Sequence, residues 1–180
     1  MKNYSLRYSL YLIIPALLLL SSCYDLKSRE RLAHAQQLLE QEYADSAANA
    51  LDSIYLPRDM GREYYMQYLV TRVQAKYKAY RELKNDTAVM EAVRYYEKQK
   101  NNPTRIAMAN YSAGVVLIEH ADYQAALKYL KHAAEAAANT GNNKLQGLIY
   151  SNIGYLYNVQ LLNKEAVAYY KLADNSFLKR

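Results

Sequence analysis

The chain has 180 residues, enough for one domain or one short array of repeats. Five glycines and three prolines argue against a loop-rich β-sandwich and favour helices, and a single cysteine excludes a disulfide framework or a cysteine-based zinc site. The formal net charge is +6. It falls to +4 (21 basic minus 17 acidic residues) without Lys2 and Arg7, which lie in an N-terminal segment that we expect to be removed. A charge of this size gives no indication of nucleic-acid binding.

The chain begins with a short basic segment and an apolar run. Residues 1–9 contain two basic residues and no acidic one, and residues 10–20 are apolar throughout. This run is about half as long as the roughly 20 residues that a bilayer-spanning helix needs, so it has the pattern of a secretory leader. It ends in Leu-Ser-Ser-Cys at positions 20–23.

This ending resembles the bacterial lipobox, in which an aliphatic residue and two small residues precede a cysteine that receives the lipid. The resemblance implies a signal peptide over 1–22, lipidation of Cys23, and a short tether over 23–27. The residue after the cysteine is Tyr24 and not aspartate, which favours the outer membrane and leaves open which face the protein occupies. A plain secretory peptide with a chance cysteine is the alternative.

The remaining chain is predicted to be helical throughout. Leu32, Ala35 and Leu39 recur at spacings of three and four, as on the buried face of an amphipathic helix, and no alternating strand pattern of any length follows. Clusters of Asn, Asp, Gly and Pro separate the helical stretches, and the cluster at 85–87 offers a helix N-cap. We predict eight helices in short antiparallel pairs, over 28–41, 45–54, 58–83, 88–100, 104–119, 122–138, 143–160 and 163–178.

Part of the sequence repeats at an offset of 40 residues. Residues 111–117 correspond to residues 151–157, and the correspondence continues to Ala126 and Ala166 in the helices that follow. Each unit has a glycine in its first helix, a turn, and then an alanine, an aliphatic residue and a tyrosine in fixed order.

These positions resemble tetratricopeptide (TPR) repeats, most clearly over 105–138 and 145–178. The resemblance implies an all-α domain over 28–180 whose antiparallel helix hairpins stack as a short right-handed solenoid. The stretch 62–83 departs from the family because it lacks the family glycine.

In the family, small residues at the helix crossing let the two axes of a hairpin approach closely. By position, Gly114 faces Ala126 and Gly154 faces Ala166, while Ala133 and Ala173 make room for the next helix. Added bulk at either glycine is expected to cost about 1–3 kcal/mol of stability through overpacking.

TPR arrays are binding surfaces, and their first helices line a concave groove that holds a peptide or a partner helix. Carried over by position, the groove residues are Tyr111, Val115, Ile118, Ser151, Tyr155 and Asn158. None of them is basic, so we do not expect the carboxylate clamp by which some TPR proteins grip acidic C-termini. An uncharged peptide suits such a groove, since tyrosine combines a large contact area with a polar tip. The alternative is that the tyrosines fill the core, which we favour for Tyr129, Tyr169 and Tyr170.

The sequence contains no recognisable catalytic or cofactor-binding motif. His34, His120 and His132 do not share a helix face as metal ligands would, and the five glycines form no phosphate-binding loop. We therefore expect no enzyme activity, no cofactor and no metal, and a protein or peptide partner in the cell envelope. Asp-Ser/Thr-aliphatic patterns at Ser46, Ser53 and Thr87 match O-glycosylation sites of some exported lipoproteins; helix capping is the interpretation we favour.

The last predicted helix is apolar on more than one face, from Ala166 to Leu178. A homodimer, a docked partner, or descent from a longer TPR-containing membrane-anchored regulator would each explain this pattern. Two functional classes remain: an envelope adaptor that recruits a partner through the groove, and a sensory module that binds a peptide or ligand and signals to a separate effector.

Overall fold

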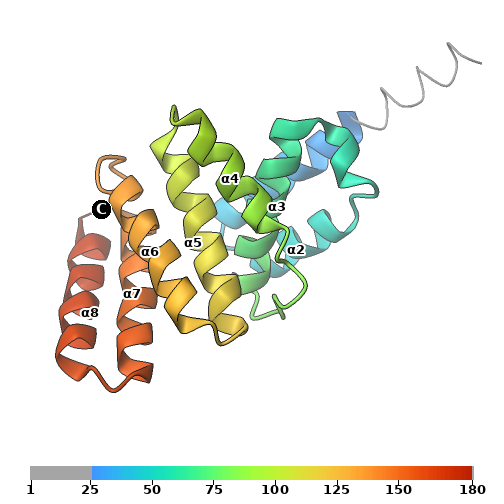
Figure 1. Cartoon of the computed structure of the whole chain (residues 1–180). Coiled ribbons are helices and arrows are strands. Elements are labelled where there is room, and N and C mark those ends of the chain that lie inside the picture. The colour runs from blue at the N-terminus through green and yellow to red at the C-terminus, as the bar shows by residue number, and fades with distance from the viewer. Residues whose placement is uncertain (1–25, 180) are drawn as a thin grey trace, which may run out of the picture. The chain divides into compact units, whose positions relative to one another are not determined.

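The computed structural model describes residues 26–179, and the predicted signal peptide and Cys23 lie outside these residues. The described part of the chain holds eight α-helices and no strand, which confirms the all-α prediction (Figure 1). The helices are residues 26–40, α2 (Ala44–Asp52), α3 (Arg62–Lys78), α4 (Val89–Gln99), α5 (Pro103–Glu119), α6 (Tyr123–Ala137), α7 (Asn143–Val159) and α8 (Asn163–Leu178), with a 3-10 turn at Pro57–Met60.

One long helix predicted over 58–83 is wrong at both ends. Gly61, at φ +83°, separates the 3-10 turn from α3, and α3 ends before Tyr80, which has φ +55°. A positive φ is incompatible with a right-handed helix, so each position interrupts the helical hydrogen-bond pattern. The segment 81–88 then connects α3 to α4 without helical structure.

Side-chain caps begin three of the helices. Asn102, Asp122 and Asn142 each accept a hydrogen bond from the backbone N–H three residues ahead, at 3.0, 3.1 and 3.0 Å. Each bond satisfies one of the amide groups that the first turn of a helix leaves unpaired. The cap predicted within 85–87 does not form, because α4 begins after Ala88 and has no side-chain cap.

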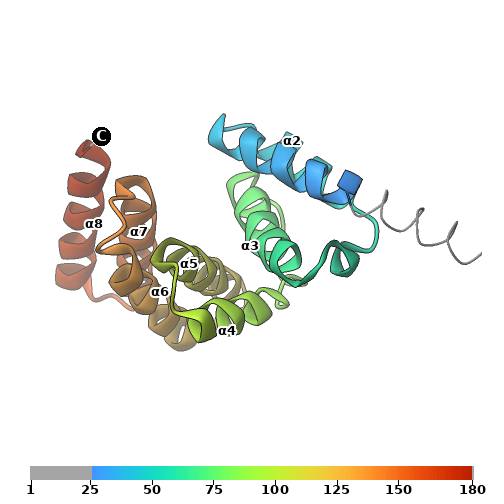
Figure 2. The same cartoon turned by 90° about the horizontal axis from the view of Figure 1, so that it is seen from above.

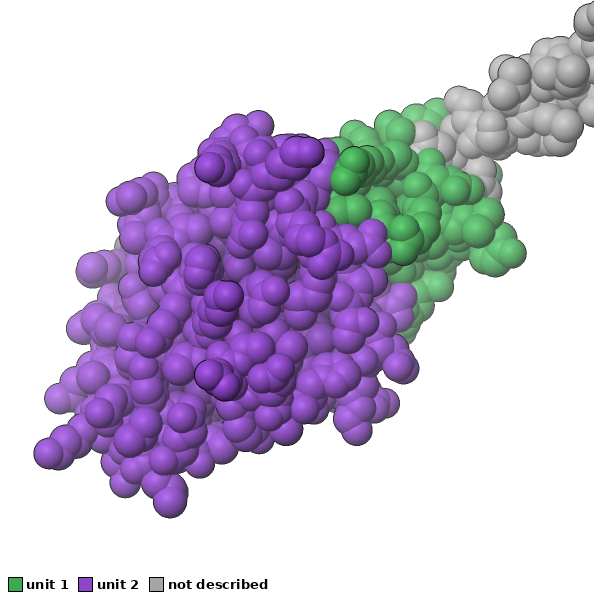
Figure 3. Space-filling model, viewed as in Figure 1, with its two compact units in different colours: residues 1–68 green, residues 69–180 purple. Residues whose placement is uncertain are grey.

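Contacts divide the chain into two compact units, residues 1–68 and 69–180, with the division inside α3 (Figure 3). In unit 1, the buried apolar side chains of the 26–40 helix include Leu32 and Ala35, and those of α2 include Leu51. The Arg31 guanidinium donates a hydrogen bond to the Ser53 carbonyl oxygen at 2.7 Å, which ties the first helix to the end of α2.

In unit 2, each helix packs against its neighbour in the chain, from α4 to α8. The contacts are most extensive within the pairs α5–α6 and α7–α8, and α5 also touches α7. Figure 1 shows these two pairs as successive antiparallel hairpins. The expectation of helices in neighbouring antiparallel pairs is thus confirmed for this unit.

The turns between paired helices share one backbone conformation. A residue with positive φ follows each first helix, and the next amide donates to the carbonyl five residues back, as in the Schellman motif. The four positive-φ residues lie 38, 41 and 40 positions apart: Glu42, Tyr80, Ala121 and Leu161, with φ of 66°, 55°, 58° and 59°. The four hydrogen bonds run from Tyr43 to Leu38 and from Arg81 to Lys76, both 2.8 Å, and from Asp122 to Leu117 and from Leu162 to Tyr157, both 3.0 Å.

Glycines set the approach of the helices within the two C-terminal hairpins. A Cβ at Gly114 would lie 2.7 Å from Leu130 Cγ, and one at Gly154 would lie 2.9 Å from the Tyr170 ring. The carbonyl oxygens of Ala126 and Ala166 lie next, at 3.5 and 3.3 Å from these Cβ positions. The facing residues predicted from the sequence are therefore close by, but Leu130 and Tyr170 are what added bulk meets first.

Gly147 is a third such position, which the sequence analysis did not single out. A Cβ there would lie 2.6 Å from Phe177 Cζ. The alanines predicted to make room, Ala133 and Ala173, are buried, as are Ala126 and Ala166.

Candidate binding surface

The six predicted groove residues differ in accessibility. On α5, Tyr111 is only 3% exposed and Val115 is also buried, while Ile118 is half-buried. On α7, Ser151 is half-buried, and Tyr155 (42% exposed) and Asn158 are accessible. A partner on this side of unit 2 would therefore reach the α7 residues far more easily than Tyr111 or Val115.

A hydrogen-bonded tyrosine network connects α3, α5 and α7. The Tyr77 hydroxyl of α3 donates to Asn152 Oδ1 of α7 at 2.9 Å. The Tyr77 ring also meets the Tyr111 ring of α5 edge-on, with 6.4 Å between ring centroids. Asn152 is held in place by a second bond, from its Nδ2 to the Leu148 carbonyl oxygen at 2.9 Å. The network thus brings the first helices of three successive helix pairs together within unit 2.

The hydroxyls of this network stay protonated at neutral pH. Burial raises the pKa of Tyr111 well above its ordinary value, and the neighbouring Tyr77 adds to the rise while hydrogen bonding to Asn152 opposes it. Burial likewise raises the pKa of Tyr77, again opposed by the bond to Asn152. Both hydroxyls are therefore neutral, and that of Tyr77 donates to Asn152.

Two accessible tyrosines lie near the network. Tyr155 and Tyr80 both lie close enough to Tyr77 to contribute to the rise in its pKa, and Tyr80 is almost fully exposed. We call Tyr77, Tyr80, Tyr111, Asn152 and Tyr155 the tyrosine surface; Tyr80 and Tyr155 are exposed, Tyr77 is half-buried, and Tyr111 and Asn152 are buried. Its exposed members offer aromatic faces and hydroxyl groups and carry no charge, which suits contact with a neutral polypeptide segment.

Sequence reasoning found Tyr111 and Tyr155 but missed Tyr77, Tyr80 and Asn152. Asn152 carried a usable signal, because it lies three residues after Ile149 and four before Leu156 and so is a polar residue on their apolar helix face. Tyr77 carried none, since one more tyrosine in a chain with 21 of them does not stand out.

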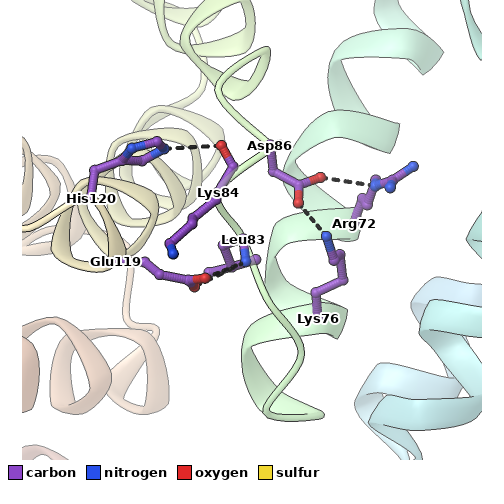
Figure 4. Close-up of polar contacts among 7 residues, drawn as sticks. All are labelled: Arg72, Lys76, Leu83, Lys84, Asp86, Glu119 and His120. Atoms are coloured by element: carbon purple, nitrogen blue, oxygen red, sulfur yellow. Dashed lines mark hydrogen bonds and ion pairs between the residues drawn. The ribbon is translucent and has the colours of Figure 1, made fainter.

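A second polar cluster holds the segment 81–88 against the helices of unit 2 (Figure 4). The buried Asp86 carboxylate pairs with Arg72 Nε at 2.9 Å and with the Lys76 ammonium, both on α3. From the end of α5, both Glu119 oxygens accept from the Leu83 amide, at 2.8 and 2.9 Å. The adjacent His120 Nε2 lies 3.0 Å from the Lys84 carbonyl oxygen (Figure 4). Asp86 therefore serves as an ion-pair partner and not as a helix cap.

The remaining candidates are surface groups. His34, His120 and His132 are exposed, and so are the hydroxyl-bearing Ser46, Ser53 and Thr87. Ser53 donates its hydroxyl to the Ala50 carbonyl oxygen at 2.6 Å. Helix capping by Asp45 and Thr87, the interpretation we favoured, is wrong, because α2 and α4 begin after Tyr43 and Ala88 without a side-chain cap. Glycosylation at the three hydroxyls stays a hypothesis.

The prediction that three tyrosines fill the core is wrong, since Tyr129 and Tyr169 are half-buried and Tyr170 is 38% exposed. Tyr169 stacks on Tyr157 of α7, with 5.4 Å between ring centroids. The exposed side chains of α8 are mixed, since the apolar Val167, Leu172 and Leu178 stand among the charged Lys171 and Asp174.

Within residues 26–179, no three His, Cys, Asp or Glu side chains gather as a metal site would require. No helix in that same range is both long and apolar enough to cross a membrane. Comparison of the chain with protein-family models, curated proteins and solved structures finds no match. A function for this chain is therefore inferred from the tyrosine surface and the helix hairpins.

Proposed function

We propose that this chain is a lipid-anchored, TPR-like scaffold of the bacterial envelope, which binds a peptide or partner helix and catalyses no reaction. The observation that carries the proposal is the tyrosine surface, because it combines residues of α3, α5 and α7, the first helices of successive pairs. A binding groove in a stacked-hairpin protein is lined by those first helices.

The repeated geometry of the chain supports the TPR-like assignment. The positive-φ turn recurs every 38 to 41 residues, and the close approaches at Gly114 and Gly154 recur at an offset of 40. Each hairpin buries only part of its apolar surface alone, so stacked neighbours must complete the core. A right-handed solenoid of such hairpins is the arrangement we propose.

The anchor in this proposal is lipid on Cys23, with residues 1–22 removed as a signal peptide. Acyl chains on the cysteine would hold the protein at a membrane surface, since each buried methylene group contributes about 0.8 kcal/mol. The outer membrane is the destination we favour, because tyrosine and not aspartate follows the cysteine. Cys23→Ala should release the protein from the membrane or leave the leader uncleaved; a processed mutant retained in the membrane would contradict lipidation.

The exposed tyrosines define the test of the groove. In one variant of the intact lipoprotein, a photo-crosslinking amino acid would replace Tyr155. In a matched variant it would replace Tyr43, an exposed residue of unit 1. We expect a discrete crosslinked envelope protein from position 155 and not from position 43. Tyr155→Ala should then weaken that partnership, whereas Tyr111→Ala would mainly test stability because Tyr111 is buried.

The outcome also separates the adaptor from the sensory module. A partner crosslinked under all growth conditions supports the adaptor that we propose. A partner that appears only when a peptide or ligand is supplied supports a sensory role. Equal products from positions 155 and 43 would refute binding at the tyrosine surface.

A further inference from the structure

One end of unit 1 exposes large apolar and aromatic side chains. Tyr55 and Leu56, in the connection between α2 and α3, are 71% and 51% exposed. Leu26, in the first described turn of the 26–40 helix, is 56% exposed. Single exposed residues of this size are ordinary, but a group of them at one end indicates an interaction site.

Two contacts bring the connection and the start of the first helix together. The hydrogen bond from Arg31 to Ser53 fixes the connection two residues before Tyr55. The Arg29 guanidinium lies 4.4 Å from the centroid of the Tyr64 ring, at the start of α3. Figures 1 and 2 both show the connection at the end of unit 1 where the described part of the first helix begins.

Cationic side chains accompany these apolar residues. Residues 26–31 and 53–64 together contain five basic and three acidic residues. The Arg58 guanidinium lies 4.7 Å from the centroid of the Tyr65 ring, and Lys27 is exposed beside Leu26. Arginine stacked on tyrosine, next to leucine and lysine, is the composition of protein surfaces that sit among lipid headgroups. We call Leu26, Lys27, Arg29, Tyr55, Leu56 and Arg58 the Tyr55 patch.

Covalent geometry places this patch near the proposed anchor. Leu26 follows Cys23 by three residues, and three extended residues span at most about 11 Å. Acyl chains on Cys23 therefore hold the membrane surface within reach of the start of the first helix. The far end of that helix is about 21 Å away, because its 14 further residues each rise 1.5 Å.

We infer that the Tyr55 patch docks on the lipid headgroups of the membrane that carries the Cys23 acyl chains. Leu26 and Leu56 enter the upper acyl region, Tyr55 lies at the interface, and the lysine and arginines contact phosphate groups. The docking orients unit 1 on the bilayer with its Tyr43 end pointing away. The place of docking rests on the proposed lipidation of Cys23. What the inference adds is the orientation of unit 1 on the bilayer.

The chain has no tryptophan, so one introduced tryptophan gives an unmixed signal. Tyr55→Trp in the intact lipoprotein is reconstituted into vesicles of phosphatidylethanolamine and phosphatidylglycerol, with or without phosphatidylcholine brominated near its headgroup. Tyr43→Trp is the matched control, because Tyr43 is 60% exposed and lies at the opposite end of the first helix. Bromolipid should quench the emission of the Tyr55→Trp protein at least about two-fold and leave that of the Tyr43→Trp protein nearly unchanged, since only buried interfacial groups meet the bromines.

Two results would overturn the inference: equal quenching of both variants, or unquenched emission from Tyr55→Trp, which, if also blue-shifted, would indicate contact with a second copy of the chain and not with lipid. Leu56→Asp added to Tyr55→Trp should reduce the quenching, and no reduction would also count against docking. Mass spectrometry of the N-terminal peptide tests the anchor separately. Lipid on Cys23 together with unquenched emission from Tyr55→Trp overturns only the docking, whereas an unmodified Cys23 overturns the proposed anchor.

Discussion

Glycine residues control how closely the helices of the two C-terminal hairpins approach. Leu130, which faces Gly114, is fully buried at the centre of its hairpin, whereas Phe177, which faces Gly147, is partly exposed near the end of α8. A fully buried side chain surrounded by other atoms cannot move aside, while an exposed ring can rotate toward solvent. The same added methyl group should therefore have different effects at the two glycines.

We predict that Gly114→Ala lowers the free energy of unfolding by about 1–2 kcal/mol, because overpacking against Leu130 outweighs the gain in helix propensity. Gly147→Ala should change it by less than about 0.5 kcal/mol, since the Phe177 ring can give way and the propensity gain compensates. Urea unfolding followed by circular dichroism measures both variants. Equal losses at the two positions would contradict this account of the hairpin contacts.

At the scale of elements, the segment 81–88 depends on side chains from its neighbours. Within the segment, the backbone forms a single turn bond, from the Asp86 amide to the Leu83 carbonyl oxygen at 2.8 Å, and the Leu83 amide donates to Glu119. The side chain of Leu83 is buried, so this amide lacks water as an alternative partner. Glu119 therefore fixes the connection between α3 and α4 from the end of α5.

Glu119→Ala should accelerate hydrogen exchange of the Leu83 amide by roughly five- to ten-fold, as expected for losing about 1 kcal/mol of hydrogen bonding. Glu119→Gln should restore most of the protection because its amide oxygen still accepts. Glu135→Ala, at an exposed position on α6, is the control. Exchange at Leu83 that is unchanged in Glu119→Ala would show that the carboxylate does not hold the segment.

The limits of sequence reasoning are visible in the same elements. The bounds of helices flanked by Asn, Asp or Pro were predicted to within a few residues, because capping depends only on residues that are neighbours in the sequence. The end of α3 was not, since Tyr80 adopts its positive φ in a turn that no glycine or asparagine marks. The bond from Tyr77 to Asn152 joins residues 75 positions apart, and helical periodicity holds no information about such a partner.

At the scale of the whole chain, the repeated turn and the tyrosine network make different contributions. The turns are local and fix each hairpin by itself, as the recurring positive-φ residues indicate. The network is long-range and joins residues of α3, α5 and α7, so it stabilises the stacking of hairpins in unit 2. Loss of the network should therefore affect overall stability without removing helices.

Alkaline pH is the condition that tests this role of the network. The pKa of Tyr111 is raised in the folded chain by burial, so above pH 10 the unfolded chain loses this proton while the folded chain keeps it. The stabilisation that the protonated Tyr111 hydroxyl contributes is fully present below its pKa in the unfolded chain, about 10. It is lost as the pH rises toward its pKa in the folded chain. Tyr111→Phe removes the titrating hydroxyl together with its hydrogen bonding.

The variant should therefore be less stable than the natural chain at pH 8, and its stability should fall less steeply between pH 10 and 12. The difference in slope should approach about 1.4 kcal/mol per pH unit, the value for one proton. Urea unfolding followed by circular dichroism at fixed pH values gives both slopes. Parallel slopes above pH 10 would mean that Tyr111 titrates alike in the folded and unfolded chain, which would contradict the burial of its hydroxyl.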